Sequence, residues 1–282
     1  MNSKTGTLYV VSTPIGNLGD MTFRAVEVLK QVDLVLAEDT RHASILFNHF
    51  DIRSPLWSFH EHNERKQLPE VLNRLEGGHN VALISDAGTP LISDPGYPLV
   101  SEARESGLDV VPIPGVSAVI AALSVSGLPT DRFCFEGFIP TKPGPRKEFI
   151  EARTENRCTT VFYESSHRIL RSLAQICESM GRDRKIVVAR ELTKKFEQFY
   201  VGTAEQVLHR VSTKQENQKG EFVIIVSGLR EVKSDDTQAR AMLEVLMQEM
   251  PLKTASKLVT KLIGGNRNHI YQLGLEMQTG QS

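Results

Sequence analysis

Hydrophobic positions follow two alternating patterns along most of this chain. Short apolar runs predict strands at residues 7–12, 34–37, 55–59, 81–85 and 110–113. Between these runs, apolar residues recur every three or four positions, which predicts helices at residues 23–31, 43–50, 65–75 and 97–106. Repeated strand–helix–strand units are typical of an α/β domain with a largely parallel sheet. We therefore expect such a domain over residues 1–118.

The same alternation restarts after a Gly-Leu-Pro break at residues 127–129. Strands are predicted at residues 132–138, 159–163, 186–189, 198–202 and 222–226, and helices at residues 146–153, 169–180 and 204–211. Residues 114–130 form the expected hinge between the two halves. The pattern predicts a second α/β domain over residues 119–230.

Residues 231–282 differ from both halves. The charged stretch that begins at residue 228 loses apolar periodicity, which is typical of a linker. Helical patterns follow at residues 240–250, 252–265 and 266–277, separated by proline and by paired glycines. Three short helices of this kind predict a small bundle of the helix-turn-helix size.

The second of these helices has two contrasting faces. Lys253, Lys257 and Lys261 recur every four residues, which places three ammonium groups on one stripe. The other face is apolar and is expected to pack, through Leu252, Ala255, Leu258, Val259 and Leu262. The lysine stripe is either a solvated surface or an RNA contact, and the pattern alone leaves both open.

Composition and charge narrow the class of protein. The chain has 282 residues with 33 lysines and arginines against 34 acidic residues, so bulk charge gives no argument for nucleic acid. Three cysteines without paired spacing indicate reduced thiols and no metal site. The first residues contain no apolar run long enough to suggest a signal peptide, and no apolar run in the sequence approaches about 18 residues. We expect a cytoplasmic protein that does not bind a membrane.

The candidate chemistry lies in the loops that follow the predicted strands, because an open parallel sheet binds ligands at the carboxyl ends of its strands. These loops span residues 13–20, 38–42, 60–64, 86–90 and 114–118. They contain neither the Gly-rich dinucleotide fingerprint nor the phosphate-binding loop of nucleotide hydrolases. Small residues beside aspartate and serine fit a nucleoside-type ligand that touches bare main chain, or they serve only as turn formers.

Seven segments resemble one known family, in order and over about residues 7–230. They are TPIGNLGD, AEDTRH, SDAGTPLISDPG, PIPGVSA, FYESSHR, ARELTK and KGEFVIIV. Together they are similar to the ribosomal RNA small subunit methyltransferase I family of the tetrapyrrole methylase superfamily. The resemblance implies a homodimer of chains with two α/β domains and S-adenosylmethionine in the cleft between them. It also implies 2′-O-methylation of a cytidine in the decoding centre of 16S rRNA, within the small ribosomal subunit.

The resemblance also assigns cofactor contacts to individual positions. It implies binding by Pro14, Asp86, Ala87, Gly88, Thr89, Ile92, Ser117, Ala118, Glu164 and Leu192. The relatives that methylate tetrapyrroles carry more glycines after the first strand, where this chain has only Gly16 and Gly19. They also carry Gly-Gly-Asp-Pro where this chain reads Ala-Gly-Thr-Pro at residues 87–90. Both departures point away from a tetrapyrrole substrate.

Three residues at strand ends are candidates for activating the acceptor oxygen, since a ribose hydroxyl is a weak nucleophile. They are Glu38, Asp39 and His60. Neighbouring residues of an extended chain point to opposite faces, so Glu38 and Asp39 cannot both enter the cleft. We expect Glu38 to orient the ribose or take its proton, with help from His60, and Asp39 to cap the following helix.

Four basic residues near strand ends are expected to contact RNA phosphates, and they are Arg41, Arg168, Arg190 and Lys194. Each has a simpler interpretation as surface charge or as part of a helix start, such as a cap at Ser165 or Ser166. Two alternative functions also stay open at this point. One is methylation of a tetrapyrrole or another small substrate, and the other is a non-enzymatic role in ribosome assembly.

Overall fold

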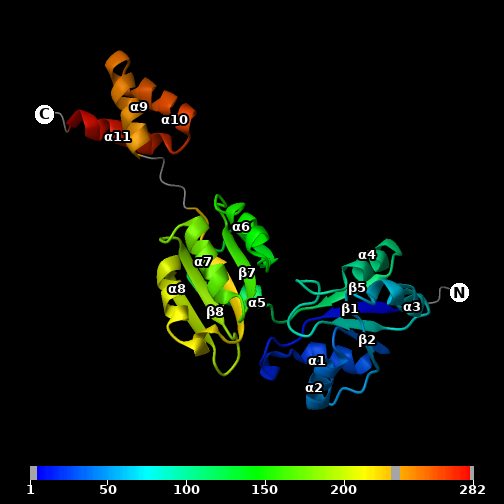
Figure 1. The fold of residues 1–282 in the computed structure, drawn as a ribbon. Coiled ribbons are helices and arrows are strands. Elements are labelled where there is room, and N and C mark those ends of the chain that lie inside the picture. Colours follow the sequence, from blue (N-terminus) through cyan, green and yellow to red (C-terminus); the bar gives the residue numbers. More distant parts are fainter. Residues whose placement is uncertain (1–4, 230–235, 280–282) are drawn as a thin grey trace. The chain divides into compact units, whose positions relative to one another are not determined.

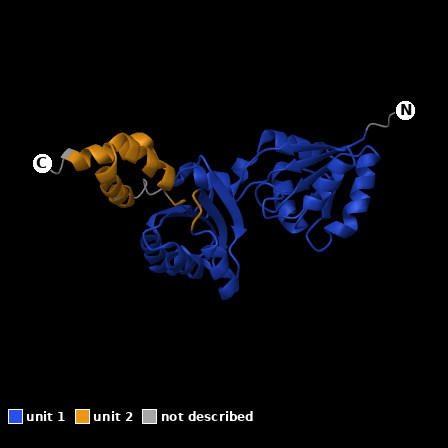
Figure 2. Cartoon of the chain, turned by 90° about the horizontal axis from the view of Figure 1, so that it is seen from above, with its two compact units in different colours: residues 1–154, 158–227 blue, residues 155–157, 228–282 orange. Residues whose placement is uncertain are grey.

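The computed structural model describes residues 5–229 and 236–279 (Figure 1). The chain divides into two compact units, one of residues 1–154 and 158–227 and one of residues 155–157 and 228–282 (Figure 2). The start of the predicted linker, at residue 231, lies outside the described residues. Within the described ranges, every helix is too short or too polar to cross a bilayer.

The first α/β domain is built on a five-stranded sheet (Figure 1). Its strands are β1 Thr7–Val11, β2 Leu34–Ala37, β3 Leu56–Ser58, β4 Val81–Ile84 and β5 Asp109–Ile113. They lie in the order β3-β2-β4-β1-β5, and every neighbouring pair is parallel. Its helices are η1 Leu18–Asp20, α1 Phe23–Gln31, α2 Thr40–Phe50, α3 Glu64–Glu76 and α4 Tyr97–Glu105. The strands, helices and parallel sheet predicted for this half are confirmed.

Two interior strands of this sheet, β2 and β4, are buried along their whole length. β2 reads LVLA and β4 reads VALI, with no exposed residue in either. Continuous apolar strands are expected where helices cover both faces of a parallel sheet. One apolar layer contains Leu29 and Phe47 from α1 and α2, and the other contains Leu75 and Leu99 from α3 and α4. The faces are therefore closed, which leaves the loops at the carboxyl ends of the strands as binding positions.

The second α/β domain has a mixed sheet. Its strands are β6 Phe133–Phe138, β7 Thr159–Ser165, β8 Lys185–Arg190, β9 Gln198–Thr203 and β10 Glu221–Val226, in the order β6-β7-β10-β8-β9. Only β6 and β7 are parallel, and the other three pairs are antiparallel. Its helices are α6 Pro143–Glu151, α7 Ile169–Met180, α8 Ala204–Ser212 and η2 Gln215–Gln218. The elements are as predicted, but the expected repeat of the parallel pattern is wrong. The loop between β8 and β9 is too short for the crossover that parallel neighbours need.

The predicted hinge at residues 114–130 contains a helix, α5 Ala118–Ser126. Val119, Ala122 and Leu123 are buried against Val187 and Val223 of the second sheet. The segment reads AVIAALSVS, so it is apolar on all sides and shows no helical periodicity. The predicted hinge therefore contains a helix that packs against the second sheet.

The C-terminal helices α9 Asp236–Glu249, α10 Leu252–Ile263 and α11 Arg267–Thr279 form a small bundle, as predicted. Its core includes Leu243, Leu252 and Ile270. The three stripe lysines of α10 are exposed, and we call them the α10 lysines. Leu258 and Leu262 were expected to pack, but they are 37% and 69% exposed.

Candidate active site

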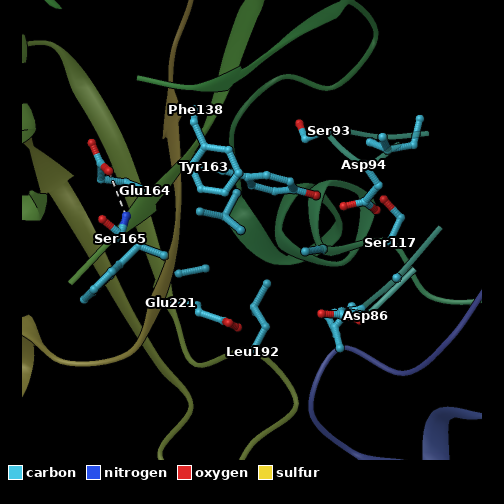
Figure 3. A pocket seen from close by; sticks show the side chains of 18 of the residues that line it. Asp86, Ser93, Asp94, Ser117, Phe138, Tyr163, Glu164, Ser165, Leu192 and Glu221 are labelled. Carbon is cyan, nitrogen blue, oxygen red and sulfur yellow. Dashed lines mark hydrogen bonds between the residues drawn. The ribbon is translucent and has the colours of Figure 1, made fainter. Parts of the chain in front are cut away.

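A cavity of about 500 Å³ lies within the larger unit and is lined by loops of both α/β domains (Figure 3). Nine predicted cofactor contacts line it, and they are Asp86, Ala87, Gly88, Thr89, Ile92, Ser117, Ala118, Glu164 and Leu192. The tenth, Pro14, is buried, and its neighbour Ile15 lines the cavity instead. The structure thus brings into one place residues from the ends of β4, β5, β7 and β8.

The loop after β4 is joined to the loop after β1 by a two-bond bridge. The Thr13 N–H donates to the Gly88 carbonyl at 2.8 Å, and the Gly88 N–H donates to the Thr13 carbonyl at 3.0 Å. Thr89 extends this connection, because its hydroxyl donates to the Val116 carbonyl at 3.1 Å. Gly88 has a φ of +84°, a conformation that favours glycine. The main chain at residues 86–89 is therefore held rigidly along one wall of the cavity.

Both loops that border the cavity most closely contain strained residues. Leu91 and Ser93, after β4, each have a φ of +72°. Glu191 and Thr193, after β8, have φ values of +52° and +65°. Left-handed backbone at a non-glycine residue costs roughly 1–2 kcal/mol. Such strain concentrates at functional sites, which supports a binding role for both loops.

Two cavity carboxyls have raised pKa values. Burial raises the pKa of Glu38, and the nearby charge of Asp86 raises it further. Burial also raises the pKa of Asp94 to about 6, with Glu38 adding to the effect. Asp94 was not among the residues predicted from the sequence, because it lies in the Asp-Pro-Gly segment at residues 94–96 and resembles a simple turn former there.

Asp39 does not line the cavity, whereas its neighbour Glu38 does. The Asp39 carboxylate caps α2 by accepting the Arg41 N–H at 2.8 Å, as predicted. The Arg41 guanidinium also binds this carboxylate, and both contacts hold the pKa of Asp39 well below its usual range. The Asp39 carboxylate is thus held at the start of α2, and a catalytic role for it stays an untested prediction.

Asp86 connects the loop after β4 to the start of α2. Its carboxylate accepts the Asp39 N–H at 3.0 Å and lies 3.0 Å from Nδ1 of His42. This hydrogen bond raises the pKa of His42. The contact therefore joins a residue that lines the cavity to the exposed surface of α2.

His60 lies near the cavity without lining it. A positive charge at this position would lower the pKa of Glu38, which places the two side chains close together. The ring of His60 packs edge-on against His62, with centroids 5.9 Å apart. Its Nδ1 atom is buried and has no hydrogen-bond partner among the residues that the structure describes.

Glu164 lines the cavity, but its carboxylate is bound on several sides. It accepts the Ser165 N–H at 2.7 Å, pairs with Arg168 at 2.8 Å and accepts the Ser172 hydroxyl. The Arg168 guanidinium also donates to the Ile139 carbonyl at 3.1 Å. The cap considered at Ser165 or Ser166 is absent, because α7 begins at Ile169 and its N-cap residue is Arg168, which makes no side-chain cap bond. The contacts with Glu164 and Ile139 hold the Arg168 guanidinium within the fold, and its expected contact with an RNA phosphate stays a prediction.

The other three basic residues differ in accessibility. Arg190 is 8% exposed, and its guanidinium donates to the Lys219 carbonyl at 2.6 Å and to Gln198 at 3.0 Å. Lys194 pairs with Glu221 at 2.8 Å and with Glu191 at 3.0 Å. The Arg41 side chain is 88% exposed beside the cavity entrance. Of the four, Arg41 is the most available to a ligand.

The wall from the second domain contains aromatic side chains that sequence reasoning did not select. Phe138 and Tyr163 line the cavity with their rings 5.5 Å apart (Figure 3). Burial, with the charge of Asp94, raises the pKa of Tyr163 to about 12, so its hydroxyl keeps its proton. Tyr163 directly precedes Glu164 in the segment FYESSHR, and this position could have identified it from the sequence as a cavity residue. Phe138 has no such sequence feature, because only the pairing of strands in the sheet brings it to the cavity.

Comparisons with known proteins agree with this geometry. The chain matches the family Tetrapyrrole (Corrin/Porphyrin) Methylases over residues 7–208 and the RsmI C-terminal HTH domain over residues 233–278. Two relatives are named Ribosomal RNA small subunit methyltransferase I. The Haemophilus influenzae protein is 46% identical over 98% of this chain and 98% of its own length. The Pseudomonas aeruginosa protein is 47% identical over 97% of this chain and 98% of its own length.

Solved structures show the same fold at low identity. Uroporphyrin-III-C-methyltransferase from Thermus thermophilus has a TM-score of 0.56 and 18% identity, covering 79% of this chain and 94% of that chain. Diphthine synthase has a TM-score of 0.60 and 14% identity, covering 78% and 89%. The predicted fold class, two α/β domains of the tetrapyrrole methylase type with a small C-terminal helical domain, is confirmed. The chain belongs to the ribosomal RNA small subunit methyltransferase I family, within the tetrapyrrole methylases.

Proposed function

We propose that this protein transfers a methyl group from S-adenosylmethionine to the ribose 2′-oxygen of a cytidine in the decoding centre of 16S rRNA, within the small ribosomal subunit. The observation that carries the proposal is the rigid, bare main chain at residues 86–89, which forms one wall of the cavity. The name shared by relatives that match along nearly the whole chain supports the substrate.

The cavity suits this cofactor in size and in chemistry. Its volume of about 500 Å³ falls within the range of roughly 300–1,000 Å³ typical of small-molecule sites. A Cβ added at Gly88 would lie 3.3 Å from Ile15 Cγ2, so the glycine keeps space free beside the main chain. Apolar side chains such as Ile15 and Leu192 suit the adenosine, and the cavity carboxylates suit a cation. We assign cofactor binding to these loops, with Pro14 acting through its neighbour.

The chemistry required of the protein is mainly positioning. The cofactor supplies an electrophilic methyl group, and transfer is an in-line displacement that needs the acceptor oxygen held close to it. Glu38 lines the cavity and has a raised pKa, so its carboxyl group is suited to hydrogen-bond the ribose. His60 lies behind Glu38 and is proposed to influence its charge. Low solvent access strengthens both interactions.

Two exposed basic surfaces are proposed to contact rRNA phosphates. Arg41 lies beside the cavity entrance, and the α10 lysines form a stripe on the C-terminal bundle. Phosphate contacts of this kind position RNA without reading its sequence. Lys194 is a weaker candidate, because two carboxylates already bind its ammonium group.

A tetrapyrrole substrate is the second candidate within the enzyme class. The proteins with that activity in their titles share only 18% identity with this chain, whereas the rRNA methyltransferases share 46–47%. The tetrapyrrole relative also covers 79% of this chain, against 97–98% for the rRNA enzymes. A purely structural assembly factor would not need a cavity with two strained loops and raised carboxyl pKa values.

A transfer assay tests the proposal. Small ribosomal subunits whose target is unmodified are incubated with the protein and methyl-labelled S-adenosylmethionine, beside large subunits and a uroporphyrinogen. We expect label in 16S rRNA only. Label in the tetrapyrrole, or none in any substrate, would contradict the proposal. Protein-free 16S rRNA in a parallel reaction shows whether the assembled subunit is required.

We also propose that the protein acts as a homodimer, as the family resemblance implies. Size-exclusion chromatography with light scattering measures this directly. A mass twice that of the chain is expected at micromolar concentration, and a monomer throughout would contradict it.

A further inference from the structure

Five carboxyl side chains line the cavity, and they are Glu38, Asp86, Asp94, Glu164 and Glu221. Three of these carboxyl groups each contact a basic side chain. The pairs are Asp86 with His42 at 3.0 Å, Glu164 with Arg168 at 2.8 Å and Glu221 with Lys194 at 2.8 Å. Glu38 and Asp94 form no ion pair within residues 5–229 and 236–279. These two are therefore the carboxyl groups available to a substrate.

The backbone holds Asp94 on the cavity wall. The left-handed Leu91 and Ser93 turn the chain back after β4, so that Asp94 lies beside Ser117 on the wall of the first domain (Figure 3). The far end of this loop is fixed, because the Gly96 N–H donates a 3.0 Å hydrogen bond to the buried carboxylate of Glu64, the first residue of α3. Strain at two residues and an anchored end keep the Asp94 carboxyl in place.

The groups that face Asp94 come from three elements. Glu38 and Asp86, after β2 and β4, are acidic, and Tyr163 of β7 lies on the opposite wall (Figure 3). The Ser85 hydroxyl hydrogen-bonds the Asp94 carboxyl. Burial and the charge of Glu38 together outweigh that bond and raise the pKa of Asp94 to about 6. Asp94 is thus mostly ionised at neutral pH and still a stronger base than an ordinary aspartate.

We propose that Asp94 is the catalytic residue that accepts the proton of the ribose 2′-hydroxyl, while Glu38 hydrogen-bonds and orients the same ribose. This inference rests on the proposed function. The pKa of a general base is best placed near the working pH, and the environment of Asp94 meets that requirement. Two neighbouring carboxyl groups whose environments separate their roles are a known pattern in acid–base sites.

The step balances in atoms and charge. The ribose O–H bond breaks as its oxygen bonds the methyl carbon, and Asp94 takes the proton. The methyl–sulfur bond breaks with its electron pair left on sulfur. A cationic sulfonium and an anionic Asp94 thus become a neutral thioether and a neutral carboxylic acid, beside the methyl ether.

The test compares Asp94→Asn with Glu38→Gln and with Asp131→Asn, an exposed aspartate outside the cavity. Single-turnover methyl transfer to small subunits is measured from pH 5 to 9, with cofactor affinity measured by calorimetry. Asp94→Asn is expected to transfer about 10²–10⁴-fold more slowly, the usual range for general acid–base catalysis, with cofactor affinity little changed. Wild type and Asp131→Asn lose rate below about pH 6, and Asp94→Asn loses this dependence. Asp94→Glu restores part of the rate.

Two failures are distinguishable. No transfer by the wild-type protein would refute the proposed function. Transfer by Asp94→Asn at the wild-type rate, with the acidic limb of the profile intact, would overturn the role of Asp94 alone. The role of Asp94 would also be overturned if Glu38→Gln abolished the loss of rate at acidic pH while Asp94→Asn retained it.

Stability gives a readout independent of activity. A raised pKa means that the folded state holds the Asp94 proton more tightly than the unfolded chain, so Asp94 favours folding below pH 3.8 and loses this effect as the pH rises to about 6. Asp94→Asn cannot ionise. The Tm of this variant relative to that of the wild type should therefore rise between pH 3.8 and about 6 and stay constant above that range. A Tm difference that does not change with pH would contradict the buried, substrate-facing position.

Discussion

Replacement of Gly88 by valine tests whether the loop after β4 binds the cofactor. Gly88 has a φ of +84°, and a Cβ there would lie 3.3 Å from Ile15 Cγ2 in the cavity wall. The left-handed backbone costs a non-glycine residue roughly 1–2 kcal/mol. For a domain of this size that lowers Tm by about 2–8 °C, since 1 kcal/mol corresponds to about 2–4 °C. The folded variant should therefore still be populated at 25 °C.

Cofactor affinity is expected to fall by more than this strain explains. The added methyl groups project toward space that the ligand needs, and overpacking of a filled site costs about 1–3 kcal/mol. That corresponds to about a 5- to 150-fold rise in Kd. Gly107→Val is the matched control, because Gly107 has a φ of +72° and nothing within 4 Å of its added Cβ. It should lose similar stability and keep the wild-type Kd.

Calorimetric titration with S-adenosylmethionine at 25 °C measures both variants, after circular dichroism has shown that each is folded. A folded Gly88→Val protein that binds as tightly as Gly107→Val would refute the assignment of this loop to the cofactor.

Three further predictions follow from the described contacts. Replacing the three α10 lysines with glutamine should reduce the salt dependence of rRNA binding, by about 0.7 in slope for each lost single-strand contact, as measured by filter binding. Asp39→Asn should lower Tm at pH 7 without slowing methyl transfer, and the difference should shrink as the pH falls below 3.8 and disappear only well below that value, where the folded wild-type carboxylate also becomes neutral. Glu164→Gln should destabilise the protein in urea unfolding, by at most about 3–5 kcal/mol, because it leaves the partly buried Arg168 guanidinium without its carboxylate.

Each of these has a contradicting result. An unchanged salt slope would make the lysine stripe a solvated surface. Slower methyl transfer by Asp39→Asn would indicate that Asp39 has a catalytic role. A Glu164→Gln protein as stable as wild type would show that the ion pair is dispensable to the fold.

The sequence pattern anticipates most of the fold because burial and periodicity agree there. β2 and β4 are continuous apolar runs, since helices cover both faces, and α1 shows a clear apolar stripe. The pattern fails at α5, which is apolar on all sides, and at the direction of the second-domain strands, which depends on connection length. Both failures concern features that a local pattern does not encode.

The site divides in the same way. Positions on loops directly after strands, such as Glu38 and Gly88, are found from the sequence because every parallel strand delivers its loop to one edge. Asp94 is missed because two left-handed residues fold its loop back, and those dihedrals leave no signal in residue type at Leu91. Arg190 looks like an RNA contact until the tertiary structure shows its carbonyl partner at Lys219.

The position of the methyl group on the nucleoside tests the central claim most directly. After reaction with labelled cofactor, 16S rRNA from small subunits is digested to nucleosides and separated by chromatography with mass detection. We expect the label to co-migrate with 2′-O-methylcytidine. A label on the cytosine ring, or on any other nucleoside, would contradict it.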